Sequence, residues 1–189
     1  SQSDGRAEIQ IMDMEKKGRI ALATLPDSQA IVQVKDRDSK PRVNLITLPS
    51  GDAEVQVLDS DKKPRVTLST LADHQAMVQV HDRNKKVRVN LHAFADNDVE
   101  VQVRDTDEKP RVVLSTTTDK QAFVQVKDCN ETQRFNVISF PDGDSEFQMH
   151  DAQAKPRLLA MTQVDADAGL SLMDANGKVR INSIIKGSG

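Results

Sequence analysis

Paired acidic residues recur along the chain with a spacing that could hold a metal ion. These Asp-x-Asp pairs are Asp36/Asp38, Asp59/Asp61 and Asp105/Asp107. A calcium loop needs about six to eight oxygen ligands, usually with a glycine bend and a later bidentate carboxylate. Here each pair is followed instead by a lysine, at Lys40, Lys63 and Lys109. We therefore expect turn structure at these acids and no metal site.

An aspartate and an arginine six residues later recur together in eight places, from Asp13/Arg19 to Asp174/Arg180. A catalytic site needs one copy that differs from the others, whereas these pairs are equivalent. Aspartate side chains commonly accept hydrogen bonds from nearby backbone N–H groups in turns. The pattern therefore predicts a ladder of turn-stabilising hydrogen bonds and charge pairs.

The remaining reactive side chains do not form a pattern. The four histidines fall at unrelated places: His74, His81, His92 and His150. Two of them on one hairpin, without a carboxylate, are a weak zinc motif. Cys129 has no histidine near it in sequence that could act as its base. Phosphate-binding and serine-hydrolase motifs are missing. We predict a non-enzymatic protein with no catalytic residues, no metal and no cofactor.

The spacing of all these residues follows from a 23-residue unit repeated eight times. The copies begin at Ala7, Ala30, Ala53, Ala76, Val99, Ala122, Ser145 and Ala168. We number positions 1 to 23 within each copy. A fixed period of this kind indicates a repeat architecture in which each unit packs on its neighbours. The sequence predicts a single repeat domain over residues 7–186, with 1–6 and 187–189 as flexible ends or residues left from cloning.

Each copy has the pattern of a β-hairpin. Positions 3, 5, 14 and 16 are apolar in every copy except for Ser183, and mostly polar residues lie between them. This spacing of two is typical of strands with one buried face. Apolar residues face each other if position 5 opposes 14, 3 opposes 16, and 2 opposes 17. That register predicts a four-residue tip, or two residues at Asn176-Gly177; a three-residue tip would pair Val34 with Arg42.

Odd- and even-numbered copies differ, which gives a second period of 46 residues. Position 2 is Glu in odd copies and mostly apolar in even ones, whereas position 15 is Asn only in even copies. The fold class is therefore an all-β antiparallel hairpin meander. We favour a rolled or stacked two-walled sheet with the Val and Leu side chains inside and the Gln and Arg columns in water. A four-bladed β-propeller is the alternative. A single-layer sheet offers no obvious cause for the alternation.

The last copy carries the sequence Leu-Ser-Leu-Met-Asp-Ala-Asn-Gly-Lys-Val-Arg over residues 170–180. It resembles the D-x-x-G-K-x-R hairpin repeats of uncharacterised bacterial proteins and, more distantly, the YD repeats of toxin-shell proteins. MORN hairpins share the period, but their glycine and aromatic pattern is missing. The resemblance implies a hairpin-repeat fold and no particular activity.

Charge and hydropathy exclude several classes of partner. The net charge is −3, with 26 basic and 29 acidic residues interleaved. This balance predicts no nucleic-acid and no membrane partner. No apolar stretch approaches the roughly 20 residues of a membrane span, and no signal peptide is visible. We expect a soluble protein of undetermined compartment.

The feature that best predicts an interaction is an apolar stripe on the even copies, on the face opposite the Val and Leu side chains. Its members are Ile31, Ile46, Met77, His92, Phe123, Ile138 and Ile184. The stripe is either a second internal layer or a surface for self-association or a protein partner; an exposed sheet edge could also bind one. We predict a structural or interaction scaffold, whose uniform period would also suit a designed protein. A natural protein-binding module is the alternative, and a propeller hydrolase or lectin is the remotest.

Overall fold

The computed structural model describes residues 6–25, 28–71, 73–164 and 167–187. They form sixteen strands that divide into two compact units, residues 1–95 and 96–189. Within the described ranges, no helix is long and apolar enough to cross a bilayer. The all-β prediction is confirmed.

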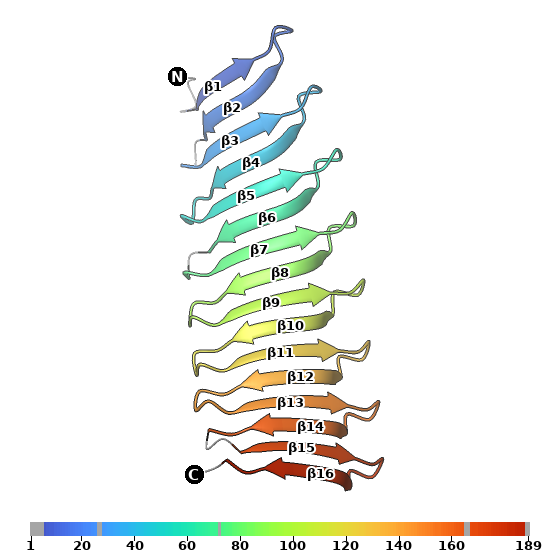
Figure 1. Cartoon of the computed structure of the whole chain (residues 1–189). Helices are drawn as coiled ribbons and strands as arrows, with labels where there is room; N and C mark the ends of the chain where they lie inside the picture. The colour runs from blue at the N-terminus through green and yellow to red at the C-terminus, as the bar shows by residue number, and fades with distance from the viewer. Residues whose placement is uncertain (1–5, 26–27, 72, 165–166, 188–189) are drawn as a thin grey trace. The chain divides into compact units, whose positions relative to one another are not determined.

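The first unit contains β1 (Ala7–Met12), β2 (Gly18–Thr24), β3 (Ala30–Lys35), β4 (Pro41–Thr47), β5 (Ala53–Leu58), β6 (Pro64–Thr70), β7 (Ala76–His81) and β8 (Val87–Ala93). The second contains β9 (Val99–Arg104), β10 (Pro110–Thr116), β11 (Ala122–Lys127), β12 (Gln133–Ser139), β13 (Ser145–His150), β14 (Pro156–Thr162), β15 (Ala168–Met173) and β16 (Val179–Ile185). Within each unit every strand pairs antiparallel with its chain neighbours (Figure 1). The predicted hairpin meander is therefore confirmed.

Each unit is a single layer. Among its described strands, only neighbours in the chain contact one another. Odd and even hairpins lie side by side in this layer, since β2 pairs with β3. The prediction of two walls is therefore wrong. The propeller is also wrong, because β4 pairs with β5 and β12 pairs with β13, where separate blades would have to part.

The predicted register holds along the strands. In the second hairpin, Val34 opposes Val43, Val32 opposes Leu45, and Ile31 opposes Ile46. The tip is different, because Lys35 opposes Pro41 and the register shifts by one residue there. Arg42 is thus an extra residue in β4. This β-bulge restores the parity that a three-residue tip would otherwise break.

Each tip has three residues between the two that close it by a backbone hydrogen bond, as residues 37–39 lie between Asp36 and Lys40. Asp36 N–H donates to the Lys40 carbonyl at 2.9 Å, and Ser39 N–H donates to the Asp36 carbonyl at 2.9 Å. Ser39 has a φ of 60°, and the last tip repeats the arrangement with Gly177 at 79°. This is the three-residue hairpin loop that ends in a left-handed residue. The predicted tip lengths of four and two residues are therefore wrong. A three-residue tip followed by a one-residue bulge gives the same strand register as a four-residue tip, so the register alone did not exclude it.

The exposure of the two faces is the reverse of what we predicted. Val and Leu at positions 3, 5, 14 and 16 are half-buried or exposed, and Leu45 is 43% exposed. The opposite face contains the residues with the least exposure at position 15, including Ala21, Val113 and Asn136. In a single layer nothing covers short branched side chains. Long Gln and Arg side chains, however, can lie flat and cover their neighbours with their apolar stems.

Candidate interaction surface

In each unit the apolar side chains at positions 3, 5, 14 and 16 share one face of the sheet, here named the Val/Leu face. Its members on interior strands stand on alternate residues of every strand and point to one side. Those above a third exposed are Leu22, Val34, Leu45, Val57, Leu68, Val80 and Leu91 in the first unit, and Val103, Leu114, Val126, Val137, Met149 and Leu170 in the second. No charged residue occupies these positions. Each unit therefore presents an uncharged apolar face to its surroundings.

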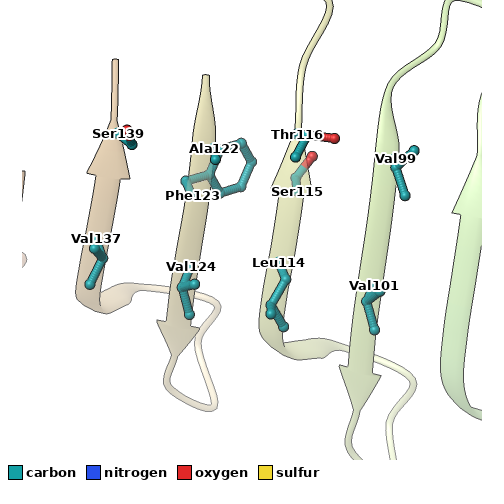
Figure 2. Close-up of a pocket in the computed structure, with 10 residues that line it drawn as sticks. All are labelled: Val99, Val101, Leu114, Ser115, Thr116, Ala122, Phe123, Val124, Val137 and Ser139. Atoms are coloured by element: carbon teal, nitrogen blue, oxygen red, sulfur yellow. The ribbon is translucent and has the colours of Figure 1, made fainter. Parts of the chain in front are cut away.

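Shallow grooves recur on this face at the 46-residue period. One groove, of about 430 Å³, crosses β9 to β12 in the second unit. Figure 2 shows Val101, Leu114, Val124 and Val137 in one row across these strands, with Thr116 and Ser139 further along. The corresponding groove in the first unit measures about 280 Å³. The residues that line these two grooves include none with a charge, so the grooves suit apolar side chains and offer no acid, base or nucleophile pair.

The opposite face of the sheet is here named the amide face. It carries a chain of hydrogen bonds between Gln, Asn and Glu side chains, here named the amide relay. Gln33 Nε2 donates to Asn44 Oδ1 at 3.1 Å, and Asn44 Nδ2 donates to Gln56 Oε1 at 3.2 Å. Gln56 Nε2 then donates to Glu54 Oε1 at 2.7 Å. The relay thus runs from an even hairpin into the next odd one. Because it needs Asn in even copies and Glu in odd copies, it gives the 46-residue period a cause in a single-layer sheet.

Parts of this relay recur elsewhere on the amide face. Gln79 donates to Asn90 at 3.1 Å, and Gln102 donates to Glu100 at 2.5 Å. Asn136 has the same position in β12, where its Oδ1 is buried without a hydrogen-bond partner among the described residues. The sequence contained the signal, since Asn at position 15 faces Gln at position 4 in every even copy that has Gln there. The prediction that this face is hydrated is wrong, because the amide side chains bind one another.

The predicted apolar stripe lies on the amide face, with its members paired as expected. Phe123 opposes Ile138, Met77 opposes His92, and Gly169 opposes Ile184. All members are half-buried except Ile184, which is exposed. His92 packs its ring against Phe94 with centroids 3.8 Å apart, and its Nε2 lies 2.6 Å from Gln75 Oε1. The stripe as a binding surface stays a prediction.

The tips confirm the ladder of aspartates and arginines. In all eight tips the Asp Oδ1 accepts the backbone N–H groups two and four residues later, as Asp59 does from Asp61 at 2.8 Å and Lys63 at 3.0 Å. The Oδ2 atom forms an ion pair with the arginine six residues later, at 2.8 Å for Arg65. Each aspartate thereby closes its own turn and holds the bulged arginine.

These contacts lower the pKa of every tip aspartate. For Asp36 the largest cause is the Lys40 N–H, with further contributions from Arg42 and the Asp38 N–H, while desolvation opposes them. For Asp82, Asp105 and Asp128 desolvation is the largest single cause and raises the pKa, but the hydrogen bonds together outweigh it. The carboxylates are therefore charged at neutral pH, and their charge stabilises the tip through the backbone N–H groups and the arginine.

Basic side chains at the tips also join successive hairpins. Arg19 Nη1 donates to the Asp36 carbonyl, and Arg42 Nη1 donates to the Asp59 carbonyl. Lysines before the second strand do the same, as Lys63 Nζ donates to the Arg83 carbonyl at 3.3 Å. A guanidinium of one hairpin thus binds the tip backbone of the next, which links the repeats along the tip edge of each unit.

The histidines and the cysteine remain scattered. His81 lies near Thr67 and the Lys85 carbonyl, whereas His92 lies near Gln75. Cys129 is an exposed free thiol at a tip. In the described part of the chain, no three His, Cys, Asp or Glu side chains gather where they could hold a metal ion.

Comparison with known proteins adds little. A scan of protein-family models and a search of curated proteins find no match. Among solved structures, the chain is similar to the SAS-4 (dCPAP) TCP domain of Drosophila melanogaster, solved in complex with a proline-rich motif of Ana2 (dSTIL). The identity is 12%, the match covers 95% of this chain and 89% of that one, and the TM-score is 0.45. This likeness is too remote to support a function.

Proposed function

We propose that the chain is a non-enzymatic repeat scaffold whose Val/Leu face docks the apolar β-layer of another protein chain. The observation that supports this is the exposure of at least one Val, Leu or Met side chain of this face on every interior strand except β14. Large exposed apolar patches on soluble proteins are typical of interaction sites. The resemblance to D-x-x-G-K-x-R hairpin repeats, which implies a fold and no activity, agrees with a scaffold.

The area of the face suits such a partner. Strands lie about 4.8 Å apart and rise about 3.4 Å per residue, so eight strands with five paired residues each present roughly 600 Å². One partner in a standard interface contributes about 800 Å². The face of one unit alone therefore approaches this size. The absence of charged side chains at the Val/Leu positions means that docking buries no unpaired charge.

A second copy of the chain is the simplest partner to use as a probe. Two Val/Leu faces would stack about 10 Å apart, as sheets do in a sandwich. The area and the exposed aliphatic rows give this arrangement its support.

The test places charge in a groove. Leu68→Lys with Leu91→Lys changes two residues that line the groove of the first unit. A control chain carries the same two lysines at the exposed tip residues Ser60 and Asn84. We expect static light scattering to give a mass above that of one chain for the natural chain and the control, and a lower mass for the groove variant. Circular dichroism should be the same for all three. Equal association of the groove variant and the control would refute docking by this face.

A further inference from the structure

The hairpin tips of the two units differ in charge. Each tip is taken here as positions 7 to 13 of its copy, from the tip aspartate to the tip arginine. The tips of the first unit, residues 13–19, 36–42, 59–65 and 82–88, hold thirteen Lys and Arg against seven Asp and Glu. The four tips of the second unit hold seven of each. The first unit therefore carries an excess of six positive charges on its tips, whereas the tips of the second unit are balanced.

The near balance of the whole chain conceals this excess. The connectors at positions 19–23 of the first seven copies hold ten Asp and one Lys. Tips and connectors lie at opposite ends of the strands, because each hairpin closes at a tip and is joined to the next by a connector. In the first unit the tips share one edge of the sheet (Figure 1). Its positive charge is thus concentrated along that edge.

Most of the extra bases are not used in the fold. Apart from the tip Asp and Arg pairs, nine bases remain on these four tips against three acids, Glu15, Asp38 and Asp61. Five of the nine bases form no ion pair within the described part of the chain: Lys16, Lys40, Lys62, Arg83 and Lys85. All of these except Lys40 are exposed. Their charge is therefore available to a ligand.

Position 10, at the end of each turn, shows the difference between the units most directly. In the first unit it is Lys16, Lys62 and Lys85, with φ of 61°, 62° and 68°. In the second unit it is Glu108 and Glu131, with φ of 64° and 63°. Lysine and glutamate take the same left-handed conformation at this position, so the turn itself does not require a base there.

The tips of the first unit form a continuous row. Arg19 binds the Asp36 carbonyl, Arg42 binds the Asp59 carbonyl, and Lys63 binds the Arg83 carbonyl, so each tip contacts the next. Neighbouring strands lie about 4.8 Å apart, which places successive tips about 10 Å apart and gives the four tips a length of about 30 Å. An extended peptide rises about 3.4 Å per residue and would follow this row with about nine residues.

We propose that the tip edge of the first unit binds an acidic segment of another protein, extended along the four tips. The tips contain no aromatic side chain on which the bases of a single-stranded nucleic acid could stack. The acids Glu15, Asp38 and Asp61 also stand among the bases. A peptide can place a neutral residue opposite each acid, whereas duplex DNA carries a charge about every 1.7 Å along its axis. The proposal does not depend on docking by the Val/Leu face.

The first experiment removes the charge where the chain itself shows that the turn accepts the change. The probe is a fluorescein-labelled peptide in which Glu and Ser alternate, and its binding is measured by anisotropy at low salt. Lys62→Glu with Lys85→Glu should raise the Kd about tenfold or more, because two attractive charges become repulsive. Circular dichroism should not change, since Glu108 and Glu131 occupy the same position elsewhere.

The matched control places the same change of net charge in the second unit. Lys120→Glu with Lys178→Glu alters two exposed lysines, one of which also has a positive φ. The Kd should change by less than about twofold, because these sites lie more than a Debye length from the basic tips. Absence of binding by the natural chain, or equal weakening by the two pairs, would overturn the proposal.

The second experiment separates the tips from the Val/Leu face. Ser60→Lys with Asn84→Lys adds two charges to the basic tips and should lower the Kd for the probe about threefold or more. Leu68→Lys with Leu91→Lys adds the same charge to the Val/Leu face and should leave the Kd nearly unchanged. Equal effects would mean that the probe responds only to net charge, and would refute the tip site while leaving docking by the face untouched.

A competition assay tests the class of partner. At physiological salt, the unlabelled peptide should displace the probe at a lower concentration of charge than a short DNA duplex or vesicles that contain phosphatidylserine. More effective displacement by the duplex would assign the tip edge to nucleic acid, and by the vesicles to an anionic membrane. Either result would show that an acidic protein segment is the wrong partner.

Discussion

Asn44 and Leu45 are neighbours in β4 whose side chains point to opposite faces. The asparagine is 8% exposed and the leucine is 43% exposed. The difference shows that polarity does not decide burial in a single-layer sheet. Side-chain length and mutual hydrogen bonding decide it, because amides of one strand reach across and cover the next. The amide face is therefore packed like a protein interior, whereas the Val/Leu face is open to solvent.

Acid should give the largest change in stability, because it protonates the aspartates of all eight tips. These tips hold the two strands of each hairpin in register and so support both faces of the sheet. The pKa of each tip aspartate is lowered in the folded chain. Their contribution to stability is therefore complete above the ordinary Asp pKa of about 3.9 and is lost as the pH falls through the folded pKa. We expect the denaturant midpoint to be flat near neutrality and to fall steeply below pH about 4.

The matched variants for this prediction are Asp36→Asn and Asp38→Asn. Asp36→Asn removes the charge pair with Arg42, so it should lower the midpoint at neutral pH and have a smaller effect in acid. Asp38 is an exposed acid of the same tip and should behave like the natural chain. A midpoint that does not change between pH 7 and pH 3 would show that the faces alone stabilise the sheet.

The second prediction compares the two faces directly at β4. Asn44→Ala leaves the amides of Gln33 and Gln56 without their shared partner, so it should reduce the free energy of unfolding by about 2–3 kcal/mol. Leu45→Ala removes a half-exposed side chain with no cavity behind it and should cost about 1 kcal/mol or less. Urea denaturation of both variants measures the difference. A larger loss for Leu45→Ala would reverse our assignment of the interior face.

The third prediction concerns the hairpin tips, which connect the strands that carry both faces. Lys62 has a φ of 62°, a left-handed conformation that strains any residue with a Cβ atom. Lys62→Gly should therefore raise the free energy of unfolding by about 0.5–1 kcal/mol, since the relief of strain exceeds the extra chain entropy. Asp61→Gly is the control, because φ is not positive at Asp61, and it should lower stability. Thermal denaturation distinguishes the two, and a loss in both variants would contradict the strain argument.

The sequence could predict the hairpins, the strand register and the role of the tip aspartates. Alternation in Val32, Val34, Val43 and Leu45 determines which residues share a face, but not whether anything covers that face. Covering depends on further layers or partners, which a two-residue period does not encode. The bulge at Arg42 was missed for a related reason. An odd loop plus one extra residue gives the same pairing as an even loop, so parity alone could not separate them.

The candidate site could be predicted only in part. The stripe residues were correctly paired across each even hairpin, as Phe123 and Ile138 are. The Val/Leu face was identified as a continuous apolar surface but was assigned to the interior, because most apolar faces of that size are buried. The amide relay depends on the reach of Gln side chains between hairpins. It could have been inferred from the alternation of Asn and Glu once a single layer was considered.

The smallest effect is expected from a change on the Val/Leu face itself. Val113 and Leu114 are neighbours in β10 that point to the amide face and the Val/Leu face, and they are 4% and 43% exposed. Leu114→Thr keeps a residue suited to strands at a hydrated site, so the free energy of unfolding should change by less than about 0.5 kcal/mol. Val113→Thr puts a hydroxyl at a site that is almost fully buried and should cost about 1–3 kcal/mol. Denaturant curves measured on the monomeric chain decide between them. If Leu114→Thr were the more damaging change, the Val/Leu face would have to be covered within one chain, and its availability to a partner would be lost.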